Sequence, residues 1–260
     1  MRKTLLALVA ATSLIGGCAG FIRERIYRPE PITGAVTWPA EAPRQVTART
    51  ADGLDLGGYY WAPEAGSGDI ILFFHGNGGN RNTAARVAEP LRRNGKGLLV
   101  ASYRGYGDNP GRPTEAGLFA DGAAFIALAR RLQPEARLFL VGWSMGGAVA
   151  LELASRVPVD GVVTIGTFTR LADVAPGIAR GFLPDRFDNL AAIGRVRAPV
   201  FLFHGTQDAI VPYAHAARLR TASGNRATVV TMNGLGHHFD FARIAAHVWR
   251  ALEGKGPPAE

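Results

Sequence analysis

The sequence predicts an α/β fold with a mostly parallel, doubly wound sheet of about eight strands and helices on both faces. Strand-like and helix-like stretches alternate along most of the chain, which is typical of a parallel sheet covered by helices. The 260 residues are 47% hydrophobic, enough to bury one substantial core. Residues 142–147 form a Gly-rich turn between a strand-like and a helix-like stretch. We therefore expect one globular domain, over residues 44–260.

Eight stretches are expected to form the strands. The first two, 45–50 and 54–61, flank an Ala-Asp-Gly turn and predict an antiparallel pair. The third, 69–74, is apolar after its first residue and predicts a fully buried strand. The others are residues 97–103, 137–141, 160–166, 199–203 and 227–232.

Five longer stretches are expected to form helices. They are residues 80–94, 114–132, 148–156, 213–221 and 239–252. Asn80 is the expected N-cap of the first, which Gly95 should end. Residues 167–198 contain Pro176, Pro184 and several glycines, and predict a small cap insert with one or two short helices.

The first 17 residues predict a signal peptide. Arg2 and Lys3 precede an apolar stretch, 5–15, that is too short for a membrane span of about 20 residues. Small residues then lead to Cys18, the one cysteine of the chain, in a pattern that resembles the lipobox of bacterial lipoproteins. The resemblance implies cleavage before Cys18 and its lipidation, and Ala19 after it favours the outer membrane. The alternative is an ordinary signal peptide with an incidental thiol.

Residues 18–43 predict a tether or an extended arm wrapped over the domain. Pro29, Pro31, Pro39 and Pro43 interrupt this segment, which shows little periodicity. The globular domain is therefore expected to begin near residue 44.

The charge of the chain does not predict a nucleic-acid surface. There are 29 Lys and Arg residues against 21 Asp and Glu, a formal net charge of +8. Most of the excess is scattered arginine, with no block of five like charges. An H-E-x-x-H motif and Cys/His clusters are also lacking, so no metal or cofactor is expected.

The Gly-rich turn contains a candidate nucleophile. Its sequence, Gly142-Trp143-Ser144-Met145-Gly146-Gly147, includes the pattern G-x-S-x-G. A serine at such a turn has a strained backbone that exposes its hydroxyl, and glycines are needed where strand and helix approach closely. Such a turn can also contain a serine by chance. Ser144 is therefore a candidate that depends on its partners.

Two residues meet the needs of a serine nucleophile. Its hydroxyl requires a histidine to accept the proton and an acid to orient that histidine. In a doubly wound sheet, such partners come from loops at the carboxyl ends of strands. Asp208 follows the strand-like stretch 199–203, and His237 follows the stretch 227–232. We therefore expect Asp208 as the acid and His237 as the base.

Other residues compete less well for these roles. His238 is the alternative base, directly next to His237, and Asp173 is the alternative acid. Asp160 precedes its strand and belongs to the wrong end of the sheet. The remaining four histidines are expected to pack or to brace loops. They are His75, His204, His215 and His247.

A tetrahedral intermediate also needs hydrogen-bond donors for its oxyanion. The backbone N–H of Met145, directly after the nucleophile, is one candidate. The second is the N–H of Asn77, in the loop 75–80 that follows the third strand. This loop does not match a phosphate-binding pattern, because Arg81 stands where a third glycine belongs. The segment 103–107, at the same sheet edge, could brace a turn or line a pocket.

Five segments together resemble the lid-poor α/β-hydrolase family of serine esterases, which includes membrane-associated acyl-protein thioesterase-like members. They are His75-Gly76-Asn77-Gly78-Gly79-Asn80, Tyr103-Arg104-Gly105-Tyr106-Gly107, Gly142-Trp143-Ser144-Met145-Gly146-Gly147, residues 204–212 and Gly236-His237-His238. The order Ser, Asp, His is the order of that family. Ser102 departs from it, since relatives often carry aspartate there. The resemblance implies an α/β-hydrolase fold from the first strand pair to the last helix.

The sequence thus predicts a lipid-anchored, extracytoplasmic bacterial serine hydrolase. It is expected to cleave small-molecule esters or thioesters through an acyl-enzyme, with Ser144, His237 and Asp208 as the triad. The alternatives are a serine peptidase acting on short peptides, and a non-catalytic envelope-tethered binding protein of the same fold. Dehalogenase chemistry is disfavoured, because it normally needs a carboxylate nucleophile. Acyl chain length and oligomeric state are not predicted.

Overall fold

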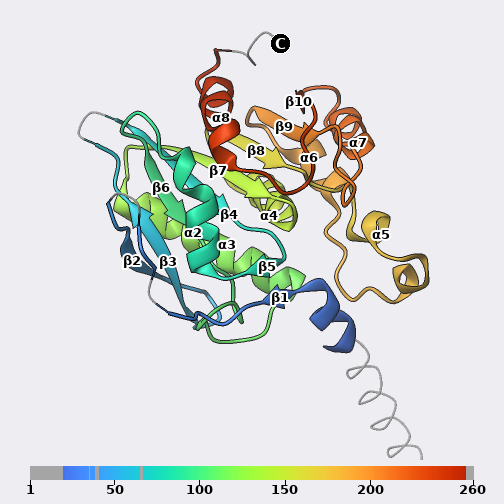
Figure 1. Cartoon of the computed structure of the whole chain (residues 1–260), viewed down its shortest axis with the longest axis horizontal. Helices are drawn as coiled ribbons and strands as arrows, with labels where there is room; N and C mark the ends of the chain where they lie inside the picture. The colour runs from blue at the N-terminus through green and yellow to red at the C-terminus, as the bar shows by residue number, and fades with distance from the viewer. Residues whose placement is uncertain (1–19, 35, 39–40, 65–66, 256–260) are drawn as a thin grey trace, which may run out of the picture.

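Eight strands form one sheet that is parallel except at one edge (Figure 1). They are β2 (Arg44–Arg49), β3 (Asp55–Trp61), β4 (Asp69–Phe74), β6 (Gly97–Val100), β7 (Arg137–Trp143), β8 (Gly161–Ile165), β9 (Val200–Gly205) and β10 (Thr228–Met232). Their order is β10-β9-β8-β7-β4-β6-β3-β2. Only β3 is antiparallel to its neighbours, β2 and β6. The predicted mostly parallel sheet is confirmed.

The computed structural model describes residues 20–34, 36–38, 41–64 and 67–255. Cys18, the expected signal peptide and residues 256–260 lie outside these ranges. Within the described ranges, no helix is both long and apolar enough to span a membrane.

Helices cover both faces of the sheet, as predicted. Alternate residues of β4 belong to two core clusters, Ile70 and Leu72 on one face and Ile71 and Phe73 on the other. The first face packs against α3 (Glu115–Leu132), α4 (Met145–Ala154), α6 (Asn189–Arg195) and α7 (Ala214–Ala222). The second packs against α2 (Arg81–Ala88), η1 (Glu89–Leu91), η3 (Phe241–Arg243) and α8 (Ala245–Leu252). Because both faces are covered, all six residues of β4 are buried.

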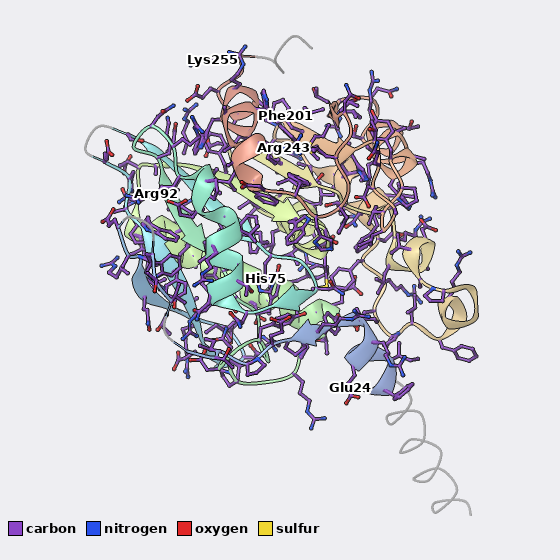
Figure 2. The ribbon with its side chains drawn as sticks, in the orientation of Figure 1. Glu24, His75, Arg92, Phe201, Arg243 and Lys255 are labelled. Carbon is purple, nitrogen blue, oxygen red and sulfur yellow. The ribbon has the colours of Figure 1, made fainter. Side chains whose placement is uncertain are left out.

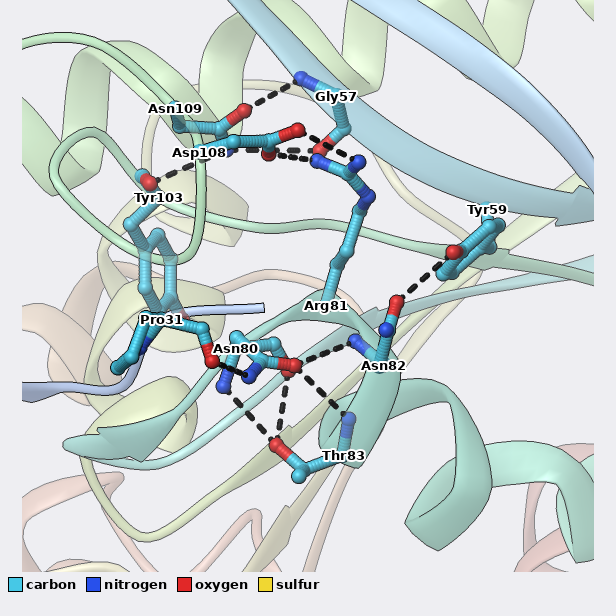
Figure 3. Close-up of polar contacts among 10 residues, drawn as sticks. All are labelled: Pro31, Gly57, Tyr59, Asn80, Arg81, Asn82, Thr83, Tyr103, Asp108 and Asn109. Atoms are coloured by element: carbon cyan, nitrogen blue, oxygen red, sulfur yellow. Dashed lines mark hydrogen bonds and ion pairs between the residues drawn. The ribbon is translucent and has the colours of Figure 1, made fainter. Parts of the chain in front are cut away.

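The first predicted helix begins as expected but ends early. Asn80 is its N-cap, and the Asn80 Oδ1 atom accepts hydrogen bonds from the N–H groups of Asn82 and Thr83 (Figure 3). The predicted continuation to residue 94 is wrong, because α2 ends at Ala88 and becomes the 3₁₀ turn η1. Pro90 lies in this turn and has no N–H to donate to an α-helix.

Other predicted boundaries also change, and three of these differences are the clearest. The strand 97–103 ends at Val100, where the chain enters the turn of residues 104–107. The helix after the nucleophile turn begins at Met145 rather than at 148. The last helix is divided, with η3 followed by α8 and Ile244 between them.

The predicted insert, 167–198, contains three short helical segments. They are α5 (Leu171–Val174), η2 (Gly177–Phe182) and α6. In Figure 1, α5 and the loops beside it lie at the side of the sheet where the chain first enters the domain.

The chain enters the domain through a segment that we call the N-terminal arm, residues 20–31. Residues 20–26 are helical, which the expected tether or extended arm did not foresee. Beyond this helix, β1 (Arg28–Pro29) pairs in parallel with β5 (Gly78–Gly79). Tyr27, which joins the helix to β1, is only 2% exposed. The arm therefore packs on the domain at the loop that follows β4 (Figure 1).

Candidate active site

Ser144 occupies the turn between β7 and α4 in a strained backbone conformation. Its φ of 54° and ψ of −117° lie where residues other than glycine are rarely found. Three hydrogen bonds hold the turn: Ser144 N donates to Ile165 O at 2.8 Å, and Ser144 O accepts from Thr167 Oγ1 at 3.1 Å and from Gly147 N at 3.0 Å. The end of the neighbouring strand β8 and the residues directly after it thereby help to fix the serine backbone.

The glycines around Ser144 are sterically required, as expected from the sequence. A Cβ atom at Gly146 would overlap the carbonyl oxygen of Phe74, and one at Gly142 would overlap the carbonyl of Gly146. A Cβ atom at Gly147 would overlap Thr167 Oγ1. Helix α4 therefore starts against β4 at a distance that no side chain permits.

Asp208 and His237 form a buried pair at the carboxyl ends of β9 and β10. His237 Nδ1 lies 2.7 Å from Asp208 Oδ2, and the two residues are 8% and 6% exposed. The other carboxylate oxygen, Oδ1, accepts hydrogen bonds from Ile210 N at 2.9 Å and Val211 N at 2.7 Å. An ionised Asp208 can only accept, so Nδ1 carries the proton and Nε2 is free to accept one.

The charge on Asp208 is stabilised although the residue is buried. Burial alone would raise the pKa of its carboxyl group. The hydrogen bonds from His237 and from the Val211 and Ile210 amides outweigh that effect, so the pKa lies below its ordinary value. Asp208 is therefore anionic at neutral pH.

The alternative base, His238, lines the same cavity as His237, but it is His237 that is hydrogen-bonded to Asp208, and the other acids lie elsewhere. His238 is exposed, and its ring packs edge-on against Trp143 with centroids 5.3 Å apart. Asp173 accepts from Thr169 Oγ1 and pairs with Arg218 of α7 at 3.4 Å. Asp160 accepts from Leu138 N at 2.7 Å, at the start of β7. Of these candidates, only Asp208 and His237 are brought together.

The loop after β4 places Gly76 and Asn77 beside the serine. A Cβ atom at Gly76 would lie 3.6 Å from Ser144 Cβ. Three contacts hold Asn77: its carbonyl accepts from Tyr106 Oη at 2.8 Å and Arg28 N at 2.7 Å, and its Nδ2 donates to Ile26 O at 2.9 Å. The loop thus approaches the nucleophile in a fixed conformation.

These groups surround one cavity of about 930 Å³. Ser144, Met145, Asn77 and His237 all line it. Much of the remaining wall is apolar, formed by Phe168, Leu171, Val174 and Leu183 near or within the insert and by Phe21, Ile22 and Ile26 of the N-terminal arm. Within the described residues, His237 is hydrogen-bonded to Asp208 and Trp143 but not to Ser144 Oγ. Such catalytic hydrogen bonds often tighten only when substrate binds.

Several residues at the site were not found from the sequence. Trp143, inside the G-x-S-x-G pattern, donates from Nε1 to His237 O at 3.2 Å and so supports the histidine loop. The three apolar arm residues carry no motif that predicts a pocket wall. The segment 103–107, by contrast, takes one of the two roles expected for it: Tyr103 Oη donates to His75 O at 3.0 Å, so this segment braces the loop after β4.

His75 and His204 are buried under the same loops. His204 Nε2 lies 2.7 Å from Val211 O, next to Asp208, and burial lowers the His204 pKa. Burial also lowers the pKa of His75 to about 4. Both histidines pack and brace, as expected.

Acidification should lower the free energy of unfolding through His75. Between pH 6.5 and about 4, the unfolded chain binds a proton at this residue that the native protein excludes. The contribution is at most about 1.4 kcal/mol per pH unit. Urea unfolding from pH 7 to pH 5 should show this slope, and His75→Gln should reduce it. His238→Gln is the matched control, because that side chain is exposed; an unchanged slope in His75→Gln would contradict the prediction.

Among the residues that the structure describes, no group of three or more His, Cys, Asp or Glu side chains is arranged to hold a metal ion.

Sequence comparisons place these features among related proteins. A family model described as alpha/beta hydrolase fold matches residues 69–192, and one described as TAP-like protein matches residues 185–246. The uncharacterized protein Rv2307c of Mycobacterium tuberculosis is 36% identical over 253 residues, which cover 91% of this chain and 89% of that protein. The human alpha/beta hydrolase domain-containing protein 17B is 30% identical over 173 residues, 65% of this chain and 60% of that protein.

Solved structures show the same fold. The esterase Pf2001 of Pyrococcus furiosus superposes with a TM-score of 0.70 at 19% identity, over 88% of this chain and 96% of that one. XC6422 of Xanthomonas campestris, described as an α/β serine hydrolase without lid, gives a TM-score of 0.64 at 18% identity, over 87% and 100% of the two chains. At these identities the likeness establishes the architecture alone.

Proposed function

The chain belongs to the α/β-hydrolase superfamily, and on that premise we propose that it is a serine hydrolase cleaving carboxylic esters or thioesters through an acyl-enzyme. The observation that carries the proposal is the buried His237–Asp208 pair, in which His237 lines the same cavity as Ser144 in its strained turn. This combination supplies a base with a fixed tautomer beside a candidate nucleophile.

In the proposed reaction, Ser144 Oγ attacks the carbonyl carbon of the substrate while His237 Nε2 accepts its proton. The carbonyl oxygen becomes an oxyanion, which the N–H groups of Met145 and Asn77 would stabilise; removing one such donor typically lowers the rate by about 10²–10³. The alcohol or thiol then leaves with the proton from His237, and the acyl group stays on Ser144. Water repeats the sequence and releases the acid.

The apolar wall of the cavity favours an acyl group over a charged substrate. We propose further that the enzyme is anchored through a lipidated Cys18, outside the cytoplasm in a bacterial envelope. This part of the proposal rests on the N-terminal sequence.

A fluorophosphonate probe tests the nucleophile. It phosphonylates an activated serine, so wild type should be labelled and Ser144→Ala should not. Ser155→Ala, at the other end of α4, is the matched control and should label like wild type, because Ser155 Oγ donates to Glu152 O and accepts from Arg195 Nη2, and Ser155 is not among the described residues that line the cavity. Equal labelling of Ser144→Ala would refute the assignment, and a preference for peptide anilides over p-nitrophenyl esters would identify a peptidase instead.

Asp208→Asn should lower kcat by roughly 10³–10⁴ with little change in KM. The Asn oxygen would be held by the Ile210 and Val211 amides, so its NH₂ would face His237. His237 Nδ1 must then accept, which places the proton on Nε2 and blocks the base. Steady-state ester hydrolysis measures the loss. Asp173→Asn should stay within a few-fold of wild type; if it lost activity while Asp208→Asn kept it, the acid would be misassigned.

A further inference from the structure

We propose that the N-terminal arm, residues 20–31, is a component of the active site: it positions the loop of Asn77 and forms one wall of the substrate cavity, and the Arg23–Asp185 ion pair holds it there. The catalytic consequence rests on the proposed function. The positioning itself does not.

The arm is hydrogen-bonded to the loop after β4 at four points. Arg28 N donates to Asn77 O at 2.7 Å, and Glu30 N donates to Gly79 O at 2.9 Å. In the other direction, Asn77 Nδ2 donates to Ile26 O at 2.9 Å, and Asn80 Nδ2 donates to Pro31 O at 3.0 Å (Figure 3). Asn77, Gly79 and Asn80 of the loop are therefore each hydrogen-bonded to the arm.

These contacts bear directly on the second oxyanion donor. Asn77 is exposed, so its own packing does not fix it. Its carbonyl is held by Arg28 N and Tyr106 Oη, and its side chain by Ile26 O. With both groups held, Asn77 cannot rotate freely, and it stays on the wall of the cavity that Ser144 also lines. Two of the three contacts that hold Asn77 come from the arm.

The helix of the arm also closes the cavity. Phe21, Ile22 and Ile26 line it, on a wall to which residues of the insert, such as Leu171 and Leu183, also contribute. Phe21 remains 60% exposed, so it lies at the mouth. An acyl chain that extends from Ser144 toward this wall would contact the arm, whereas an acetyl group would not reach it.

One ion pair clamps the helix to the domain. Arg23 Nε donates to Asp185 Oδ2 at 2.9 Å, and Arg23 Nη2 donates to Oδ1 at 3.1 Å, a bidentate pair. The Asp185 side chain is 4% exposed and also accepts from Glu115 N at 3.2 Å. The Glu115 carboxylate in turn accepts from Arg186 N and Phe187 N, both at 2.7 Å. The arm is thus fastened where the insert meets the start of α3.

The test compares Arg23→Met with wild type in the full chain. Releasing the helix should accelerate amide hydrogen exchange at residues 76–80. It should lower kcat about tenfold for p-nitrophenyl acetate and for a long-chain ester alike. KM should rise several-fold for the long-chain ester and stay near wild type for acetate, because only the long chain reaches the arm. Arg23→Lys, which keeps the charge but loses the bidentate geometry, should fall between the two.

Glu24→Gln is the matched control. Glu24 lies on the same helix, exposed, and is not among the described residues that line the cavity (Figure 2). It should match wild type in every measurement. Asn77→Ala adds a variant that leaves the clamp intact: it keeps the N–H donor, removes the tie to Ile26 O, and should lower kcat with KM for acetate unchanged.

Two outcomes would overturn the inference. One is a folded Arg23→Met protein with wild-type kcat, KM and loop exchange. The other, should Arg23→Met fail to fold, is an Asn77→Ala protein with wild-type kcat. If the wild-type protein hydrolyses no ester and reacts with no fluorophosphonate, the proposed function is refuted instead. Faster amide hydrogen exchange at residues 76–80 in Arg23→Met would then still support the positioning of the loop by the arm.

Discussion

Replacing Ser144 with alanine is expected to reduce kcat for ester hydrolysis by roughly 10⁴-fold or more. The substitution removes the atom that bonds to the acyl carbon, while the cavity and the oxyanion donors stay in place. KM should change little, because the serine hydroxyl contributes mainly in the transition state. Residual hydrolysis above the rate in water is expected, since oxyanion stabilisation and binding remain.

A second substitution at this position separates chemistry from stability. Ser144 has a φ of 54°. This backbone conformation is strained for serine and for alanine, but not for glycine. Ser144→Gly should therefore be as inactive as Ser144→Ala but unfold at a higher temperature than Ser144→Ala. Thermal unfolding and turnover of the same samples make this comparison. Activity within tenfold of wild type in both variants would show that another residue is the nucleophile.

Replacing Gly146 with alanine is expected to destabilise the protein by roughly 3 kcal/mol or more, or to prevent folding. The added Cβ would overlap Phe74 O and lie 2.6 Å from His75 O. Both are backbone atoms of β4 and the loop after it, so neither can move away as a flexible side chain would. Relief requires α4 to shift, which would displace Ser144.

Gly194→Ala is the control for this prediction. Gly194 is also helical, in α6, but it is exposed and the nearest atom to its added Cβ lies 3.4 Å away. Alanine there should leave stability unchanged or raise it slightly, because alanine favours helix. Urea unfolding and soluble yield measure both variants. If Gly146→Ala were as stable as wild type, the junction of α4 and β4 would have room for a methyl group, and the prediction would be wrong.

Local sequence patterns were sufficient to predict the sheet, and to predict that the candidate active site lies at the carboxyl ends of its strands. The apolar run 70–74 is too short for a typical buried helix and has the length of a buried strand. The structure places it at the centre of the sheet. Ser144, Asp208 and His237 each follow a strand, and parallel strands bring such loops to one edge. The early end of α2 was also within reach, since Pro90 is a local signal.

Other features depend on contacts between distant residues. His237 and His238 are neighbours of the same type; the sequence favours His237, and the contact with Asp208 depends on the tertiary fold. The arm helix is held by Asp185, 162 residues away in the chain. Nothing in the local sequence of the arm shows that its apolar side chains line a cavity. Such contacts are set by the tertiary fold.

The span of the arm contacts has a consequence for biosynthesis. The candidate site and the arm bring residues 20–31 together with Asp185, Asp208 and His237, which are synthesised much later. A nascent chain that has not yet reached His237 therefore cannot assemble the candidate site. Contacts of such long separation also form slowly during folding. We therefore expect the candidate site to form only after β10, which directly precedes the His237 loop, has joined the sheet.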